Sequence, residues 1–175
     1  RGFEHWSPLT IETQGIGGAE LCAAYLAKEL AIMGHRPLLH AEAEGIYDGV
    51  VYHKEYNPML PSDLLISSRV PELFKAPTRT KVRLLWVHDV HCRNALTPEV
   101  VRNIDGIIAL SHWHVDYLKA VYPFLEDCEV VDMEGREQTY KDVPGGHPVY
   151  GAIMGSPSSV VVGQPSVAVE QPPTT

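Results

Sequence analysis

The sequence has little of what marks a secreted, membrane-spanning or nucleic-acid-binding chain. Its 175 residues include only three cysteines, an odd and scattered set that excludes a disulfide framework and makes a reducing cytoplasm the expected location. No apolar run is long enough to span a bilayer and no signal peptide is recognisable, so we expect no transmembrane segment. Basic residues are outnumbered, 14 against 22 acidic ones, and the net charge of −8 argues against nucleic acid as the main partner.

What is present fits one ordinary domain with its own core. Short apolar runs of strand length, several of them apolar on both faces, alternate with helical segments. This pattern is typical of a parallel sheet that is covered on both sides. The sequence therefore predicts an α/β fold with a doubly wound, mostly parallel sheet. The expected strands are 37–41, 49–52, 64–66, 82–87 and 106–110.

Helix signals lie before and between these strands. The clearest helix is predicted over residues 18–33, and Gly34 suits the left-handed residue just past its end. Thr97 is expected to cap a second helix and Ser111 a third, which Pro123 ends. The expected buried face of the first helix consists of apolar residues at helical spacing, namely Cys22, Leu26, Leu30 and Met33.

The composition changes after about residue 132. Residues 1–132 form the predicted domain, whereas residues 133–175 are rich in proline and glycine and predict a tail or linker. Within the tail, residues 159–163 include three consecutive valines and predict a strand.

A glycine-rich turn leads into the first predicted helix. The stretch "GIGGAE" lacks the third glycine of the dinucleotide fingerprint, because Glu20 stands in its place. No Lys-Ser or Lys-Thr pair follows, so it is not a P-loop either. A glycine turn at a helix start is a generic anion site. The alternative interpretation is a turn whose glycines let the chain pack closely.

The order of the motifs resembles the N-terminal domain of family-4 glycosyltransferases with the GT-B fold. The resemblance covers roughly residues 3–123. It implies a Rossmann-like half of a two-domain enzyme that transfers a sugar from a nucleotide-sugar donor to a sugar, lipid or protein acceptor. It implies no cofactor and no metal. The motifs are the Gly-Gly-Ala-Glu turn, the helix ending in "GH", "DLLISSRVP", "LLWVHDVH" and "IDGIIALSHWHVDYLKAVYP".

The resemblance gives roles to the glycine turn and to residues that follow predicted strands. Gly15, Gly17 and Gly18 match the position that approaches the donor diphosphate. His88 would face the donor sugar or the acceptor, and Asp89 would orient it or bind an acceptor hydroxyl. These assignments make His88 and Asp89 the expected catalytic residues.

Two further residues are expected to contact acceptor or sugar, each with a structural alternative. Arg69 would touch phosphate or acceptor, and the alternative is a surface arginine. Ser111 would contact the sugar, and the alternative is a plain helix cap. For His88 the alternative is a bond to a backbone carbonyl.

Other chemistry is disfavoured by the sequence. His88, His91 and Cys92, with His112 and His114 nearby, are ligand types that zinc accepts, but their spacing matches no structural zinc pattern. His112 and His114 are expected on the solvent side of their helix. Nothing indicates a lowered thiol pKa at Cys92, which disfavours a nucleophile. Trp86 and Trp113 are expected in core or edge packing rather than in a sugar-stacking platform.

Two features depart from the family's pattern. The strand that begins such domains would lie before Arg1, and no second, donor-binding domain is recognisable after residue 123. We therefore expect the acceptor-side part of a longer protein or of a homo-oligomer, and the alternative is a catalytically inactive binding or assembly module. Domains of this family place that first strand in the middle of the sheet, so its absence would leave backbone groups of the two neighbouring strands unpaired. Residues 160–162 are hypothesised to fill that position, in this chain or from a neighbouring copy, and a disordered linker is the alternative.

Overall fold

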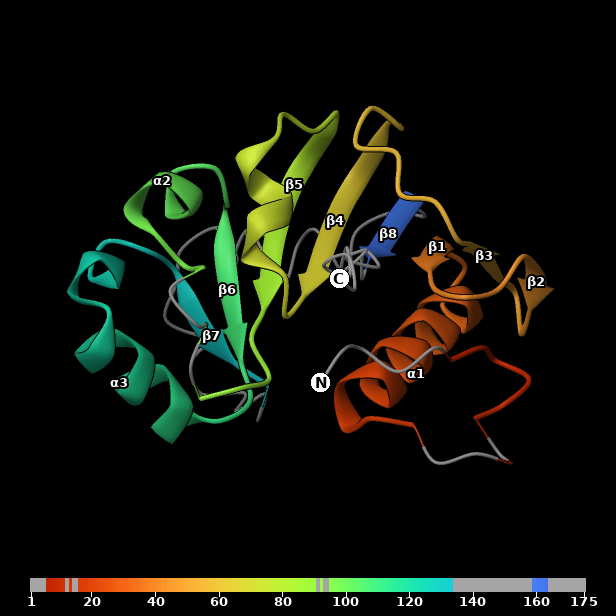
Figure 1. Cartoon of the computed structure of the whole chain (residues 1–175), viewed down its shortest axis with the longest axis horizontal. Helices are drawn as coiled ribbons and strands as arrows, with labels where there is room; N and C mark the ends of the chain where they lie inside the picture. The colour runs from red at the N-terminus through yellow and green to blue at the C-terminus, as the bar shows by residue number, and fades with distance from the viewer. Residues whose placement is uncertain are drawn as a thin grey trace, which may run out of the picture.

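An eight-stranded sheet organises the chain (Figure 1). The computed structural model describes residues 6–11, 13, 16–90, 92 and 95–133, and the backbone of residues 159–163. The strand order is β2-β3-β1-β8-β4-β5-β6-β7, and every neighbouring pair is parallel except β2 with β3. The predicted α/β, Rossmann-like fold with a mostly parallel sheet is confirmed.

The strands and helices have the following bounds. The strands are β1 Arg36–His40, β2 Gly45–Tyr47, β3 Val50–His53, β4 Ser62–Ser68, β5 Thr80–Trp86, β6 Gly106–Ala109, β7 Val130–Asp132 and β8 Ser159–Gly163. The α-helices are α1 Gly18–Ile32, α2 Pro98–Val101 and α3 His112–Val121, and the 3₁₀ helices are η1 Pro71–Lys75 and η2 Pro123–Leu125.

Hydrophobic side chains form one core on each face of the sheet. The core on the α1 face contains Leu39, Leu64, Leu84 and Trp86 together with alanines of α1. The opposite core contains the alternate strand residues together with side chains of η1, α2 and α3, including Leu65, Phe74, Leu85, Val100, Ile107 and Leu118. Because each face of the sheet is covered by a core, its strands need apolar side chains on both faces.

Helix α1 ends as the sequence predicts, but only part of its expected face is buried: Leu30 is buried and Leu26 is partly buried. Gly34 has φ +92°, and the His35 N–H donates to the Leu30 carbonyl at 3.0 Å, which is a Schellman ending. Cys22 and Met33, expected to be buried, are exposed. Small residues face the sheet instead, because they let the helix axis approach the strands closely. The buried residues are Ala19, Glu20, Ala23, Ala24, Ala27 and Leu30.

The hairpin β2–β3 was not expected, although its signal is in the sequence. Asp48 and Gly49 connect Tyr47 to Val50, and both have positive φ, 51° and 78°. Two consecutive left-handed residues form the two-residue turn that matches strand twist, and Asp-Gly is a preferred pair for it.

Strand β8 lies at the centre of the sheet (Figure 1). Val161 is opposite Leu38 of β1 and opposite Leu65 of β4, with parallel pairing on both sides. The hypothesis that residues 160–162 fill a central position is therefore confirmed for the backbone. Their side chains, and residues 134–158 and 164–175 of the predicted tail, lie outside the described residues.

The position of β8 gives the sheet a point where the strand order reverses. On one side of β8 the chain places β1, β3 and β2, and on the other side it places β4, β5, β6 and β7. In open parallel sheets such a switch point opens a crevice beyond the carboxyl ends of the strands, and ligands bind there.

Candidate functional site

The sequence-predicted site residues gather at the carboxyl edge of the sheet. Arg69 follows β4, His88 and Asp89 follow β5, and Ser111 follows β6. The first turn of α1 reaches the same edge, because Glu20 contacts Arg69. Gly17 and Gly18 therefore lie beside these residues, and Gly15 lies outside the described residues.

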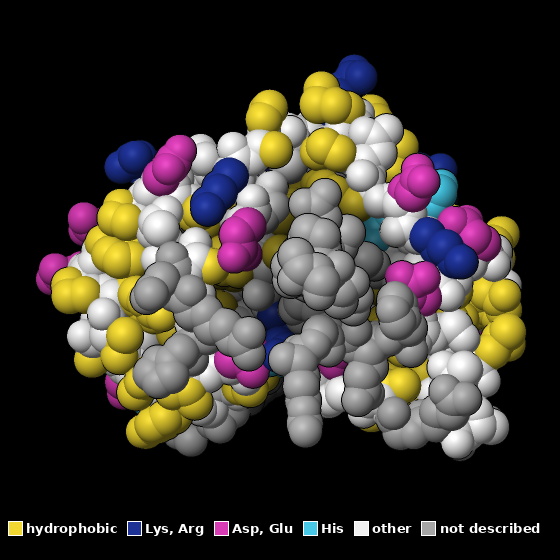
Figure 2. Space-filling view, in the orientation of Figure 1, with side chains coloured by type: hydrophobic (Ala, Val, Ile, Leu, Met, Phe, Trp, Pro, Cys, Tyr) yellow, Lys and Arg dark blue, Asp and Glu magenta, His cyan; other side chains and the backbone are white. Residues whose placement is uncertain are grey.

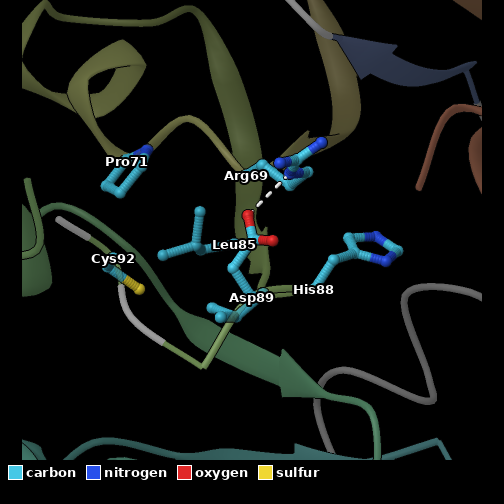
Figure 3. A pocket seen from close by; sticks show the side chains of 7 residues that line it. Arg69, Pro71, Leu85, His88, Asp89 and Cys92 are labelled. Atoms are coloured by element: carbon cyan, nitrogen blue, oxygen red, sulfur yellow. Dashed lines mark hydrogen bonds and ion pairs between the residues drawn. The ribbon is translucent and has the colours of Figure 1, made fainter. Parts of the chain in front are cut away.

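Arg69 connects three elements from an unusual backbone conformation. Its φ is +68°, which is uncommon for a residue with a side chain, and its N–H donates to the Trp86 carbonyl at 2.9 Å. The guanidinium Nε donates to Asp89 Oδ2 at 2.8 Å (Figure 3), and Nη1 lies 3.5 Å from Glu20 Oε1. A left-handed arginine held by two carboxylates is the kind of local strain that clusters at functional sites.

Glu20 occupies part of the predicted anion site. The carboxylate is buried and lies against Gly17, where a Cβ atom would overlap it. Gly17 is the N-cap of α1 and Glu20 is its third helical residue, which is the spacing of a capping box. Gly18, in contrast, has no atom within 4 Å of the place a Cβ would take. Gly17 makes room for the Glu20 carboxylate, and only Gly18 leaves space beside the start of α1.

His88 is uncharged at neutral pH. Burial, and next the positive charge of Arg69, lower the pKa of His88 to about 4, although Asp89 acts in the opposite direction. The ring packs on Trp86 with 4.4 Å between ring centroids. Its side chain diverges from that of Asp89, which turns to Arg69 (Figure 3). The His-Asp pair is therefore not a hydrogen-bonded acid–base couple in this structure.

His114 lies inside the protein, contrary to the expectation that it faces solvent. It is 4% exposed, because α3 buries His114 together with Val115 and Leu118. The Leu110 N–H donates to Nδ1 at 3.2 Å, so the neutral ring carries its proton on Nε2. Burial lowers the pKa of His114, and the nearby Asp89 backbone and carboxylate oppose this.

Three buried ring nitrogens near this edge have no hydrogen-bond partner among the described residues. They are Trp86 Nε1, His88 Nε2 and His114 Nε2. A buried polar group without a partner costs about 1–3 kcal/mol, so such groups call for a ligand or a water molecule. Arg69 and the half-exposed Asp89 supply the donors and acceptors that a polar ligand at this edge would reach.

A small cavity of about 20 Å³ lies between Arg69, Asp89 and Cys92 (Figure 3). This volume is enough for about one water molecule. Burial raises the pKa of the Cys92 thiol to about 11, which leaves it protonated at neutral pH and unsuited to nucleophilic attack.

Ser111 acts as the cap of α3. Its Oγ accepts the His114 N–H at 3.3 Å, which is the plain helix cap given above as the alternative to sugar contact. No group of three metal-ligating side chains gathers in the part of the chain that the structure describes, and His91 lies outside that part.

The charge of the site favours a neutral, hydroxylated ligand. Glu20 and Asp89 are two carboxylates around the single guanidinium of Arg69. A free diphosphate would meet two negative charges beside one positive charge. Carboxylates, a guanidinium and neutral imidazoles all hydrogen-bond to hydroxyl groups.

Larger hollows lie elsewhere. One of about 450 Å³ lies at the amino edge of β4 and β5, beside Ser62, Arg79 and Lys81. Another of about 480 Å³ lies between α2 and η2 and is lined by Arg102 and Phe124. Neither contains any residue of the predicted site.

Two residues of the site, Glu20 and His114, were named from the sequence but were given no role in this site. Glu20 stands three residues after the glycine that begins the helix, and this capping-box spacing could have shown that its carboxylate turns back to Gly17. His114 lies four residues before Leu118, and that spacing could have placed it on the buried face of α3.

Comparisons with family models, with curated proteins and with solved structures gave no match to this chain. No helix within the described ranges has the length and apolar character needed to cross a membrane. The assignment of function therefore depends on the site itself.

Proposed function

We propose that this chain is the acceptor-side half of a glycosyltransferase that moves a sugar from a nucleotide-sugar donor to an acceptor. The observation that carries the proposal is the meeting of Arg69, His88, Asp89 and the first turn of α1 at one edge. This edge lies where the strand order reverses, which is where open parallel sheets bind ligands. The order of the sequence motifs supports the same class.

In this proposal Asp89 binds an acceptor hydroxyl and His88 binds a sugar hydroxyl. The Asp89 side chain is half exposed, which leaves its carboxylate accessible to a ligand beside Arg69. Because the pKa of His88 is lowered to about 4, its ring is neutral and too weakly basic for efficient proton transfer at pH 7. His88 therefore orients the sugar, and the reaction depends on positioning and electrostatic stabilisation.

The donor diphosphate would approach Gly18 and the start of α1. The first N–H groups of a helix have no partner within the helix and attract anions. Glu20 reduces that attraction, and Arg69 is already paired with carboxylates. We therefore propose that a second domain, or a second copy of the chain, supplies most of the positive charge for the diphosphate.

The second candidate is a catalytically inactive module that binds a saccharide through the same edge. The excess of carboxylate over guanidinium at the site favours it, because a neutral saccharide needs no diphosphate contact. For either candidate we propose the cytoplasm as the location, in keeping with three free cysteines.

The test is a donor screen with a matched pair of variants. Uridine, guanosine and adenosine diphosphate sugars are titrated into the chain by calorimetry, with and without a mixture of saccharide acceptors. Asp89→Asn is compared with Asp105→Asn, whose carboxylate pairs with Arg83 just before β6, away from the site.

The proposal predicts weak binding of one donor class and a loss of acceptor-dependent heat in Asp89→Asn alone. Saccharide binding without any donor binding supports the inactive module. Equal effects of the two variants, or no binding of donor or saccharide, contradict both candidates.

A further inference from the structure

Two aromatic side chains form a stacked pair on the outer face of α3. The rings of Trp113 and Tyr117 have centroids 5.2 Å apart and planes at 25°. Trp113 is 62% exposed, contrary to the expectation that it packs in the core or at an edge. Figure 2 shows hydrophobic side chains gathered at the lower left, where Figure 1 places α3. We call Trp113 and Tyr117 the aromatic platform.

Polar groups lie next to the aromatic platform. His112 is adjacent to Trp113 in the sequence, and its Nδ1 lies 3.6 Å from Asp132 Oδ2 at the end of β7. Its Nε2 lies 4.0 Å from Asp116 Oδ2. His112 and Asp116 are largely exposed, so their donors and acceptors remain accessible to a ligand.

This combination suits one chemical class. A pyranose ring has an apolar face of C–H groups, which packs on an aromatic ring, and an edge of hydroxyl groups, which needs carboxylates or imidazoles. A lipid surface would meet the carboxylates of Asp116 and Asp132 beside the rings, and burying them without a cationic partner is unfavourable.

The aromatic platform lies close to the candidate site but not inside it. His114, whose side chain is buried near Asp89, directly follows Trp113 on α3. Successive side chains of an α-helix project about 100° apart, so the exposed Trp113 lies on a different face of α3 from the buried His114, on a helix whose diameter is roughly 10 Å. A ligand that spans both places must be longer than a single sugar.

We propose that the aromatic platform binds a sugar ring of an oligosaccharide acceptor, remote from the reacting hydroxyl at Asp89. That the bound oligosaccharide is the acceptor of the reaction rests on the proposed function. The binding of saccharide to the platform does not depend on any donor.

Tryptophan fluorescence tests this directly. Trp6 and Trp86 are 5% and 2% exposed, so iodide quenches mainly the emission of Trp113. Cellotriose, maltotriose, chitotriose and mannotriose are titrated, each beside its monosaccharide, and protection from iodide is measured. The variants are Trp113→Ala, Trp113→Phe and Tyr117→Ala. The matched control is Tyr25→Ala, an exposed aromatic residue of α1.

We expect one trisaccharide to protect Trp113 and its monosaccharide to do so much less. Tyr117→Ala, followed by Trp113 emission, should weaken binding roughly three- to tenfold, as expected for loss of an aromatic stack. Calorimetry should give a similar loss for Trp113→Ala, a smaller one for Trp113→Phe and none for Tyr25→Ala.

Three results overturn the inference. They are no protection by any trisaccharide, protection that depends on protein concentration, and protection by phosphatidylcholine vesicles instead of saccharides. Circular dichroism melts confirm that each variant is folded. Protection that persists in Asp89→Asn, with no donor binding in the screen above, would sustain the platform while the glycosyltransferase proposal fails.

Discussion

Arg69 is the residue through which the candidate site is assembled. It leaves β4 in a left-handed conformation, and its guanidinium then lies between a carboxylate from α1 and a carboxylate that follows β5. Glu20 is buried, and its carboxylate contacts Arg69 and lies at the start of α1. The balance of charge around one guanidinium therefore sets which ligands the edge accepts.

Removing the Glu20 charge should strengthen anion binding. In Glu20→Gln the start of α1 loses the carboxylate that competes with a phosphate group. We expect uridine diphosphate to bind roughly two- to fivefold more tightly, in line with the ~0.3–1 kcal/mol that one charge contributes at a helix end. Calorimetry measures this, and Glu29→Gln, an exposed glutamate of the same helix, is the control. Unchanged or weaker binding in Glu20→Gln would show that anions do not use this helix start.

The neutral His88 makes stability depend on pH. Its pKa is about 4 in the folded protein and about 6.5 in the unfolded chain, so the unfolded chain binds more protons between these values. The stabilisation is complete above pH 6.5 and is lost as the pH falls through about 4.

Urea unfolding at pH 7 and pH 5 tests this dependence. The free energy of unfolding should fall less on acidification in His88→Gln than in the parent chain. His112→Gln, which changes an exposed histidine, should behave like the parent. The same acid loss in all three proteins would refute the buried, neutral state of His88.

At the scale of elements, the starts and ends of helices were predictable, because residues close together in the sequence determine them. The ending of α1 follows from Gly34, and the starts of α2 and α3 follow from Thr97 and Ser111, whose hydroxyls accept the expected N–H groups. The buried face of α1 was predicted only in part, with Leu30 buried but Cys22 and Met33 exposed, because helical spacing selects large apolar residues. The distance between helix and sheet instead selects Ala23 and Ala27, which are fully buried.

The site was predictable only in part, for a related reason. Strand ends identified Arg69, His88 and Asp89, because parallel strands bring their carboxyl ends to one edge. The contact of Glu20 with Arg69 joins α1 to β4, and no pattern local in sequence encodes it.

Proline in β8 should be far more disruptive than proline at the edge of the sheet. Val161 pairs with strands on both sides, so Val161→Pro removes a ladder hydrogen bond and leaves a carbonyl without its partner. We expect a loss of about 3 kcal/mol or more in the free energy of unfolding. Ile46→Pro in the edge strand β2 should cost less than half as much. Urea unfolding compares the two variants, and equal losses would mean that β8 does not hold the centre of the sheet.

For the whole molecule, the central strand determines where the site lies. β8 pairs with β1 on one side and with β4 on the other. From β8 outward, the strands follow in sequence order in opposite directions, β1 and β3 on one side and β4 to β7 on the other. This arrangement places the start of α1 beside the ends of β4 and β5, although these segments are far apart in the sequence. The larger hollow at the amino edge offers a competing location, so the ligand-binding edge is the central question.

Backbone amide shifts on titration with the diphosphate sugars and trisaccharides answer this question most directly. Our account predicts that the largest shifts fall on Gly18, Arg69 and Asp89 at the carboxyl edge, and that the trisaccharides also shift Trp113 and Tyr117 of the aromatic platform. Shifts gathered at Ser62 and Thr80, beside the hollow at the amino edge, would contradict it, as would the absence of any shift.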